Sequence, residues 1–229
     1  MNIEEIYKIL LKEYGEQGWW PVTQENEIIP VYRKDNYNLT EKQMLEICLG
    51  AILTQNTSWN NVEKVIINLN KEKLIEVNKL NEIRINELAL LIKSAGYFNQ
   101  KAKTIKNFMK FIKKYNNLKE MFKDEEIRNK LLEIKGIGNE TTDSILLYAG
   151  QLKYFVIDTY TKRIFSRIGI VSRDVEYLEL QKIFHDNLKN NPLLFNEYHA
   201  LIVEHAKIYC KKKPKCEKCI LNNNCNKII

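Results

Sequence analysis

Apolar residues recur at intervals of three and four along most of this 229-residue chain, the spacing that gives a helix one buried face. Thr40 precedes one such stretch and is followed three positions later by Gln43, a pairing typical of a capping box at a helix start. Helices are predicted over residues 3–14, from Thr40 into the segment AILTQN, and over 60–69, 71–77, 85–94, 100–115, 127–134, 139–149, 159–168, 175–187 and 197–209.

The interruptions between these stretches also favour helices. Glycine and proline are scarce, at 8 and 4 residues, which argues against a β-rich architecture. Gly96 is expected to end one helix, and Gly150 breaks the pattern again. Residues 25–38 are polar and irregular and are expected to form a loop, whereas 154–157 is a short apolar extended stretch. With no alternating strand series and no internal repeat, the predicted fold class is all-α.

The charge balance is basic. The chain carries 36 lysine and arginine residues against 29 acidic residues, a formal net charge of +7. Such a balance suits a polyanionic partner, most simply nucleic acid, although a lysine-rich solvated surface would give the same count. No stretch approaches 18 consecutive apolar residues and no secretory signal is evident, so we expect a cytoplasmic, nucleoid-associated protein without a membrane partner.

Four of the five cysteines are crowded near the C-terminal end, at Cys210, Cys216, Cys219 and Cys225, separated by five, two and five residues. In a reducing compartment, cysteines clustered in this way bind metal more often than they form disulfides. Four thiolates suit either zinc or an iron–sulfur cluster, so the spacing leaves the metal open. The fifth, Cys48, falls on an apolar helix face and is expected in the core.

A second pattern lies over residues 127–149, which read as a helix, a short turn containing Gly136 and Gly138, and another helix. Glycines allow a tight turn and a close approach to another chain. Backbone N–H groups at the start of the second helix suit a phosphate oxygen, a contact that is independent of base sequence. The alternative is a plain αα-hairpin.

Asp158 follows the apolar stretch and precedes the helix predicted at 159–168, so it is placed to cap that helix. A helix start favours the ionised carboxylate. An anion fixed there could stabilise a developing cation or activate a water molecule, although most aspartates at such positions only cap.

The hairpin, the aspartate some twenty residues later and the four-cysteine tail occur in one order, and this combination resembles the endonuclease III superfamily of helix-hairpin-helix DNA glycosylases. The resemblance covers nearly the whole chain. It implies that Asp158 is the catalytic residue and that the cysteines hold a [4Fe–4S] cluster, with zinc as the alternative. It also implies that Lys135, Gly136, Ile137 and Gly138 grip DNA while Gln55 fills the gap left by an extruded base. The family commonly has six residues, not five, between its first two cysteines.

One departure from the family bears on mechanism. Members that also cut the DNA backbone carry a lysine early in the helix after the hairpin, and this chain has Glu140 there. A carboxylate cannot form the imine that strand cleavage needs. The resemblance therefore implies a monofunctional glycosylase that uses water. The alternatives are a bifunctional glycosylase/lyase for oxidised pyrimidines and a metal-stabilised DNA-binding module without catalysis.

The segments QGWWP, GAILTQNTSW and GIGNETTDSILLYA also resemble the 3-methyladenine DNA glycosylase branch. This implies that Trp19, Trp20 and Pro21 wall a base pocket, where indole rings would stack on a cationic alkylated purine. The alternative is that both tryptophans anchor the N-terminal helix. The branch lacks the cysteine cluster that this chain has.

Together these resemblances imply a two-lobed, all-α protein. Residues 42–150 would form a helical barrel that includes the hairpin, and residues 1–41 with 151–229 a second lobe carrying the cysteine loop at 210–225. Damaged double-stranded DNA would lie across the cleft between the lobes, and a monomer is the simplest expectation.

Overall fold

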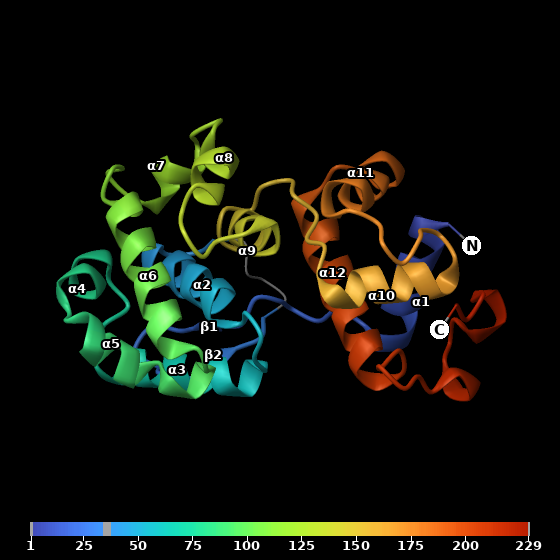
Figure 1. The fold of residues 1–229 in the computed structure, drawn as a ribbon, viewed down its shortest axis with the longest axis horizontal. Coiled ribbons are helices and arrows are strands. Elements are labelled where there is room, and N and C mark those ends of the chain that lie inside the picture. The colour runs from blue at the N-terminus through green and yellow to red at the C-terminus, as the bar shows by residue number, and fades with distance from the viewer. Residues whose placement is uncertain (1, 34–37, 229) are drawn as a thin grey trace. The chain divides into compact units, whose positions relative to one another are not determined.

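The computed structural model describes residues 2–33 and 38–228, which group into two compact units (Figure 1). The hairpin unit spans residues 20–152, and the terminal unit combines the residues up to Trp19 with those from Lys153 onward. The division expected from sequence placed the boundaries after residues 41 and 150. In the structure, residues 20–41 group with the hairpin unit.

The hairpin unit is helical apart from one short antiparallel ribbon, in which Val22 lies opposite Val31. This ribbon takes up part of the loop predicted at 25–38, of which residues 34–37 lie outside the described residues. In chain order the elements of this unit are β1 (Val22–Thr23), β2 (Pro30–Val31), α2 (Glu41–Leu53), α3 (Trp59–Lys71), α4 (Val77–Glu82), α5 (Ile85–Leu91), the 3₁₀ turn η1 (Lys93–Ala95), α6 (Phe98–Ile112), α7 (Leu118–Phe122), α8 (Ile127–Leu132), α9 (Asn139–Ser144) and the π-helical turn η2 (Ile145–Ala149).

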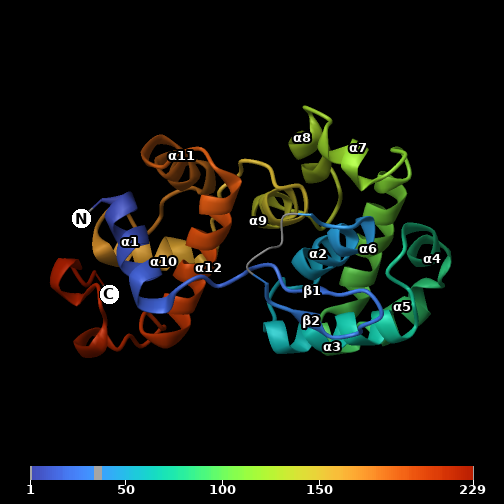
Figure 2. The same ribbon diagram turned by 180° about the vertical axis from the view of Figure 1, so that it is seen from behind.

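Helix α2 forms the centre of the hairpin unit. Every residue from Leu45 to Leu53 is buried, so this helix is covered on all sides rather than along one stripe. Helices α3, α6, α7 and α9, together with η2 and β1, contact it, and Figure 2 shows α2 between the β-ribbon and α6. The predicted capping box is confirmed: Thr40 Oγ1 accepts from the Gln43 backbone at 3.2 Å, and Gln43 Oε1 accepts from the Thr40 backbone at 3.0 Å.

The terminal unit packs α1 (Ile3–Tyr14) and α10 (Thr159–Ile168) against the long helix α12 (Pro192–Ile208). Its core is aromatic, because the rings of Phe155 and Phe184 stack at 3.9 Å and the Tyr198 ring packs edge-on to both. The Tyr198 hydroxyl donates to the Ile3 carbonyl oxygen at 2.7 Å and so ties α1 to α12. The elements are α1 (Ile3–Tyr14), α10 (Thr159–Ile168), α11 (Tyr177–Asn187), α12 (Pro192–Ile208) and the 3₁₀ turns η3 (Cys216–Lys218) and η4 (Asn222–Asn224).

The all-α prediction is confirmed, and the helices predicted at 3–14 and 159–168 have the observed bounds. The helix predicted over 71–77 is wrong, because α3 ends at Lys71 and Lys73 then adopts a left-handed φ of 52°. Helix α12 begins at Pro192, upstream of its predicted start, because Asn191 caps it and proline suits a first turn. Among the described residues, no helix is long and apolar enough to cross a bilayer.

Candidate active site and nucleic-acid interface

A bidentate ion pair joins α8 and α9, the two helices of the hairpin. Arg128 in α8 donates from Nε to Asp143 Oδ1 at 2.8 Å and from Nη2 to Oδ2 at 3.1 Å, and Nη2 also reaches Asn139 Oδ1 at 3.0 Å. The Asp143 side chain is fully buried. Such a forked pair fixes the angle between the helices as well as their distance. Nothing in the local sequence pattern distinguished these two residues from the other charged residues of the chain.

The turn between these helices places its residues on opposite sides. Lys135, Gly136 and Gly138 are exposed, whereas Ile137 is 5% exposed and anchors the turn in the core. Gly136 has a φ of 98°, and a Cβ there would lie 2.2 Å from Thr104 Oγ1, so only glycine fits. A Cβ at Gly138 would meet nothing within 4 Å. The fold therefore requires glycine at position 136. No contact among the residues that the structure describes requires glycine at position 138.

Gln55 lies against this turn. It follows the end of α2, and its Nε2 donates to the Gly136 carbonyl oxygen at 3.0 Å and to Thr141 Oγ1 at 2.8 Å. Lys101 supports the same region from α6, since its Nζ donates to the carbonyl oxygens of Leu53 at 2.9 Å and Ala95 at 2.8 Å. The structure therefore brings the predicted gap-filling residue and the predicted DNA-gripping turn into direct contact.

A basic hollow opens beside the turn, between α6 and the end of α8. Tyr115 and Lys130 both donate to Asp124 Oδ2 at 2.6 Å, and these hydrogen bonds, that of Lys130 first, lower the Asp124 pKa to about 2. The Asp124 carboxylate is therefore ionised at neutral pH and pairs with Lys130, one of the lysines that line the hollow. The lining residues are Asn107, Lys110, Phe111, Lys114, Tyr115, Asp124, Lys130, Glu133, Ile134 and Lys135.

Asp158 belongs to the terminal unit and caps α10. Its Oδ1 accepts from the Thr161 backbone N–H at 2.7 Å and from the Thr161 hydroxyl at 2.8 Å. Its Oδ2 lies 3.6 Å from His199 Nε2, an ion-pair distance, and the carboxylate is 11% exposed. Burial is the largest single influence on its pKa and raises it, but the interactions with His199 and Thr161 together outweigh burial and leave the pKa lowered. The carboxylate is therefore ionised at neutral pH.

The predicted pocket residues divide between the two units. Trp19 is half-buried in the terminal unit, with its ring 6.0 Å from the His199 ring and its carbonyl oxygen accepting from Asn196 Nδ2 at 2.9 Å. Trp20 is buried in the hairpin unit, where its ring packs edge-on to Trp59 at 5.6 Å and Tyr148 at 5.0 Å. Pro21 follows it and is buried as well. Trp19 is thus the member of the three whose ring meets His199, the partner of Asp158.

The four cysteines of the C-terminal loop are free, half-buried thiols that line one cavity. Burial is the main cause that raises the pKa of Cys219, and the charges of the other three cysteines raise it further. Across residues 2–33 and 38–228, however, no three His, Cys, Asp or Glu side chains are arranged as a ready-made site for a single metal ion. Their number, chemistry and shared cavity fit a thiolate-bound group.

The loop is bound to α10. Arg163 Nε donates to the Cys210 carbonyl oxygen at 2.8 Å, and Arg167 donates from Nη1 to Cys210 Sγ at 3.4 Å and to the Lys211 carbonyl oxygen at 2.6 Å. His205 Nε2 lies 3.4 Å from Cys219 Sγ, and burial lowers the His205 pKa to about 4. The helix that Asp158 caps is therefore attached to the cysteine loop through Arg163 and Arg167.

Comparison with known proteins identifies the family of this chain. Residues 49–190 match the family model described as "HhH-GPD superfamily base excision DNA repair protein". The chain belongs to the HhH-GPD superfamily. It is 44% identical to a Methanocaldococcus jannaschii protein whose name assigns it provisionally to the DNA repair glycosylases, over 97% of this chain and 95% of the relative. It is 29% identical to endonuclease III of Sulfolobus acidocaldarius, over 84% and 91% of the two chains.

Solved structures agree with this membership. H. pylori 3-methyladenine DNA glycosylase bound to 1,N6-ethenoadenine is 26% identical and superposes with a TM-score of 0.71, covering 90% of this chain and 98% of that one. A trapped endonuclease III–DNA covalent intermediate gives a TM-score of 0.77 at 20% identity, covering 98% and 94%, and so shows the shared fold. The resemblance expected from the motifs is confirmed: this HhH-GPD member is a base excision repair DNA glycosylase.

Proposed function

We propose that this HhH-GPD protein is a monofunctional glycosylase that hydrolyses the N-glycosidic bond of an alkylated purine flipped out of double-stranded DNA. The observation that carries the proposal is the ionised carboxylate of Asp158, fixed at the start of α10 through one oxygen while the other faces His199. A base inside a duplex is out of reach, so the target nucleotide must leave the stack first.

The chemistry follows from the charge of this group. When the C1′–N bond breaks, its electron pair goes to the departing base and positive charge builds on the sugar. The Asp158 carboxylate stabilises that charge and orients a water molecule whose oxygen bonds to C1′. For a cationic alkylated base, the base leaves neutral and the water releases one proton to solvent, so charge and atoms balance without a general acid.

We propose that the protein does not cleave the DNA strand, because Glu140 cannot act as the lyase nucleophile. This residue is exposed in the first turn of α9, where lyase members of the family carry the lysine that attacks the sugar. A carboxylate forms no imine with a sugar aldehyde. Endonuclease III relatives favour the alternative, a glycosylase/lyase acting on oxidised pyrimidines. Only that alternative predicts a covalent adduct when borohydride is added during turnover.

The alkylated substrate class is supported by Trp19 and by the 26% identity to a 3-methyladenine DNA glycosylase. Lys207 Nζ lies 5.6 Å from the centre of the Trp19 ring, so one cation already uses its π-face. An electron-poor methylated purine could stack on the same indole. Trp20, packed against Trp59 and Tyr148, would instead hold the chain in place.

DNA binding is assigned to the hairpin unit. The exposed backbone of Gly136 and Gly138 and the side chain of Lys135 would contact phosphates, with Lys110 and Lys114 extending this surface along the hollow. Gln55 would leave its contacts with the turn to fill the space of the flipped nucleotide. We propose that the protein acts as a monomer, which sedimentation at micromolar concentration would test.

Cys210, Cys216, Cys219 and Cys225 are proposed to hold a [4Fe–4S] cluster, with zinc as the alternative. The bound group would cross-link the loop through four thiolates. The chain's own residues then do the rest: Arg163 and Arg167 connect that loop to α10. Lysines 211, 212, 213 and 215 are exposed and would offset the negative charge of the thiolates.

The deciding experiment is single-turnover excision on duplexes that carry different lesions, with wild-type protein and the Asp158→Asn variant. We expect excision of N-alkylated purines, a loss of about 100-fold or more in the variant, and unchanged DNA affinity. Excision by the variant at the wild-type rate would remove Asp158 from the mechanism. Release of oxidised pyrimidines with borohydride trapping would favour the endonuclease III-like alternative.

A further inference from the structure

His199 occupies an unusual position for a histidine outside a metal site. It lies in the middle of α12, its side chain is 6% exposed, and its Nε2 atom is buried from solvent. That atom lies 3.6 Å from Asp158 Oδ2. His199 and His205 both lie in α12, the helix that leads to Cys210. The structure separates them, since His205 lies against Cys219 and His199 against Asp158.

The two oxygens of Asp158 have different partners, and this restricts rotation of the carboxylate. Oδ1 is held by the backbone and hydroxyl of Thr161 in the first turn of α10. Oδ2 faces His199 from α12. A capping interaction explains the first contact but not the second, because an N-cap needs only one oxygen. The contact with His199 therefore has no role in forming the helix.

The burial of His199 limits what it can do. A ring nitrogen with no solvent exposure cannot reach a flipped base, so His199 is not suited to protonate the leaving group. It can act through Asp158. With Nε2 protonated, the ring points a positive hydrogen at Oδ2, and this favours the ionised carboxylate in a site where burial opposes ionisation.

Trp19 packs against the face of α12 that carries His199. Asn196 donates to the Trp19 carbonyl oxygen, the His199 ring meets the Trp19 ring edge-on, and Lys207 lies over that ring. These α12 residues recur at intervals that bring them to one side of a helix. The same rigid element thus fixes the carboxylate and the indole proposed to stack on the substrate.

We propose that His199 is a positioning residue of the glycosylase reaction, which orients Oδ2 of Asp158 and keeps the carboxylate ionised. The inference rests on the proposed role of Asp158 and deepens it. His199 touches neither the substrate nor the reacting atoms. The described groups that contact the Asp158 carboxylate are His199 from α12 and Thr161 from α10.

The test compares His199→Gln, which keeps an N–H donor without a charge, with His199→Leu, which has neither. Single-turnover excision is measured as a function of pH on the lesion that the wild type removes. We expect the rate on the plateau to fall by about 10-fold in the glutamine variant and about 100-fold in the leucine variant. The acidic limb of the profile, which reports ionisation of Asp158, should move to higher pH in both.

The matched control is His185→Gln, in the same unit, where His185 Nε2 accepts from the Phe155 backbone at 3.3 Å. Its acidic limb should stay where the wild type has it. Thermal unfolding and DNA affinity are recorded for each variant, because a purely space-filling role for His199 would lower the unfolding temperature and leave the limb unmoved. That result, or excision by both His199 variants within twofold of wild type, would overturn the inference. The proposed function fails separately, if Asp158→Asn remains active.

Discussion

Gln55 and Gly136 are joined by a hydrogen bond of 3.0 Å, from the side-chain amide of one to the backbone carbonyl of the other, although they are 81 positions apart. The contact links the segment after α2 to the turn of the helix-hairpin-helix. The second bond of Gln55 Nε2, to Thr141 Oγ1 at 2.8 Å, ends in the first turn of α9. The residue proposed to fill the DNA gap is therefore bound, in the folded chain, to the turn proposed to contact DNA.

Removing this amide should affect excision more than stability. Gln55→Ala loses two hydrogen bonds at a partly exposed site, a cost of about 1 kcal/mol each at most. The excision rate should drop more on a fully paired duplex than on one whose lesion lies in an unpaired bubble, where no stacked gap needs filling. Equal losses on the two substrates would contradict the gap-filling role.

The two glycines of the turn should behave differently when substituted. Gly136→Ala places a Cβ on Thr104 at a φ of 98°, so we expect a loss of about 1–3 kcal/mol in the free energy of unfolding. Gly138→Ser has open space around its Cβ and retains a good N-cap, so its stability should match wild type.

DNA affinity separates these glycine variants further. If the Gly138 backbone approaches a phosphate, the serine variant should bind undamaged duplex several-fold more weakly although it is fully folded. Fluorescence anisotropy and urea unfolding measure the two quantities. Wild-type affinity in Gly138→Ser would mean that DNA does not approach this residue.

The sequence was most informative where a residue's role is local. Capping by Thr40 and Asp158 needs only the three following positions, and the structure places both as the spacing predicted. Periodicity likewise gave helices 3–14 and 159–168. The turn at Lys73 escaped prediction, because a left-handed residue other than glycine has no strong local signal.

Contacts between distant segments were not predictable in this way. His199 and Asp158 are 41 positions apart, as their numbers show, and a single histidine on an apolar helix face is usually just part of a core. Glu46 is a similar case: it is buried in α2, accepts hydrogen bonds from Thr23 and Asn70, and has a pKa raised by burial. Only tertiary packing gives these polar groups their partners.

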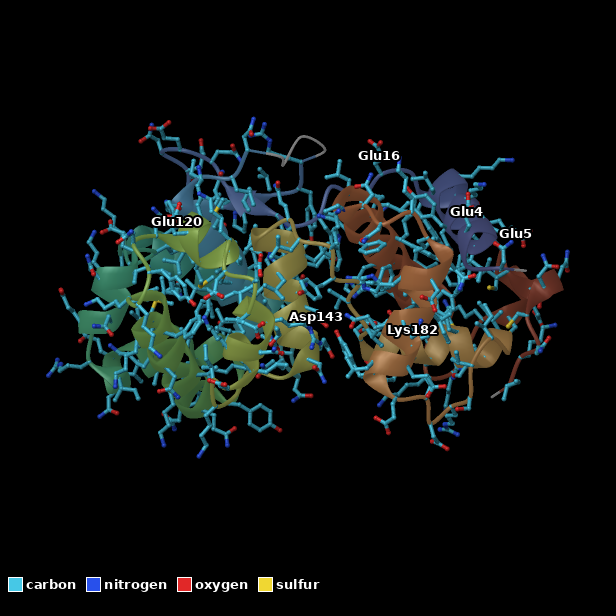
Figure 3. The ribbon with its side chains drawn as sticks, turned by 90° about the horizontal axis from the view of Figure 1, so that it is seen from above. Glu4, Glu5, Glu16, Glu120, Asp143 and Lys182 are labelled. Carbon is cyan, nitrogen blue, oxygen red and sulfur yellow. The ribbon has the colours of Figure 1, made fainter. Side chains whose placement is uncertain are left out.

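The ion pair inside the hairpin should be worth much more than those at the surface. Figure 3 labels Asp143 of α9 and Lys182 of α11, which belong to two such pairs. Asp143→Ala removes the carboxylate that accepts two hydrogen bonds from Arg128 at a largely buried position, and we expect a loss of about 3 kcal/mol. Lys182→Ala opens an exposed pair with Asp186 and should cost about 0.5 kcal/mol or less. Similar losses in chemical denaturation would contradict the distinction.

Lysines of the basic hollow should contribute to the salt dependence of DNA binding. In the double variant Lys110→Gln/Lys114→Gln, the slope of log Kobs against log salt should become shallower by about 0.9 for each phosphate that is no longer neutralised. Lys8→Gln/Lys12→Gln removes the same charge from α1 in the terminal unit and serves as the control. An equal change in both variants would indicate an effect of net charge alone rather than of the hollow.

Loss of the proposed thiolate-bound group should loosen the loop and leave the hairpin unit intact. Purified protein is expected to be brown, with absorbance at about 400 nm and about four iron atoms per chain if the group is [4Fe–4S]. Cys219→Ala should lose both signals, and proteolysis should then cut the exposed segment 211–215, because the loop would depend on hydrogen bonds to α10 such as those of Arg163 and Arg167. Cys48→Ala is the matched control, since Cys48 is fully buried in α2 of the hairpin unit. If the purified protein contains one zinc ion per chain and no iron, the bound group is zinc and not a cluster. If Cys219→Ala retains its iron, Cys219 is not a ligand.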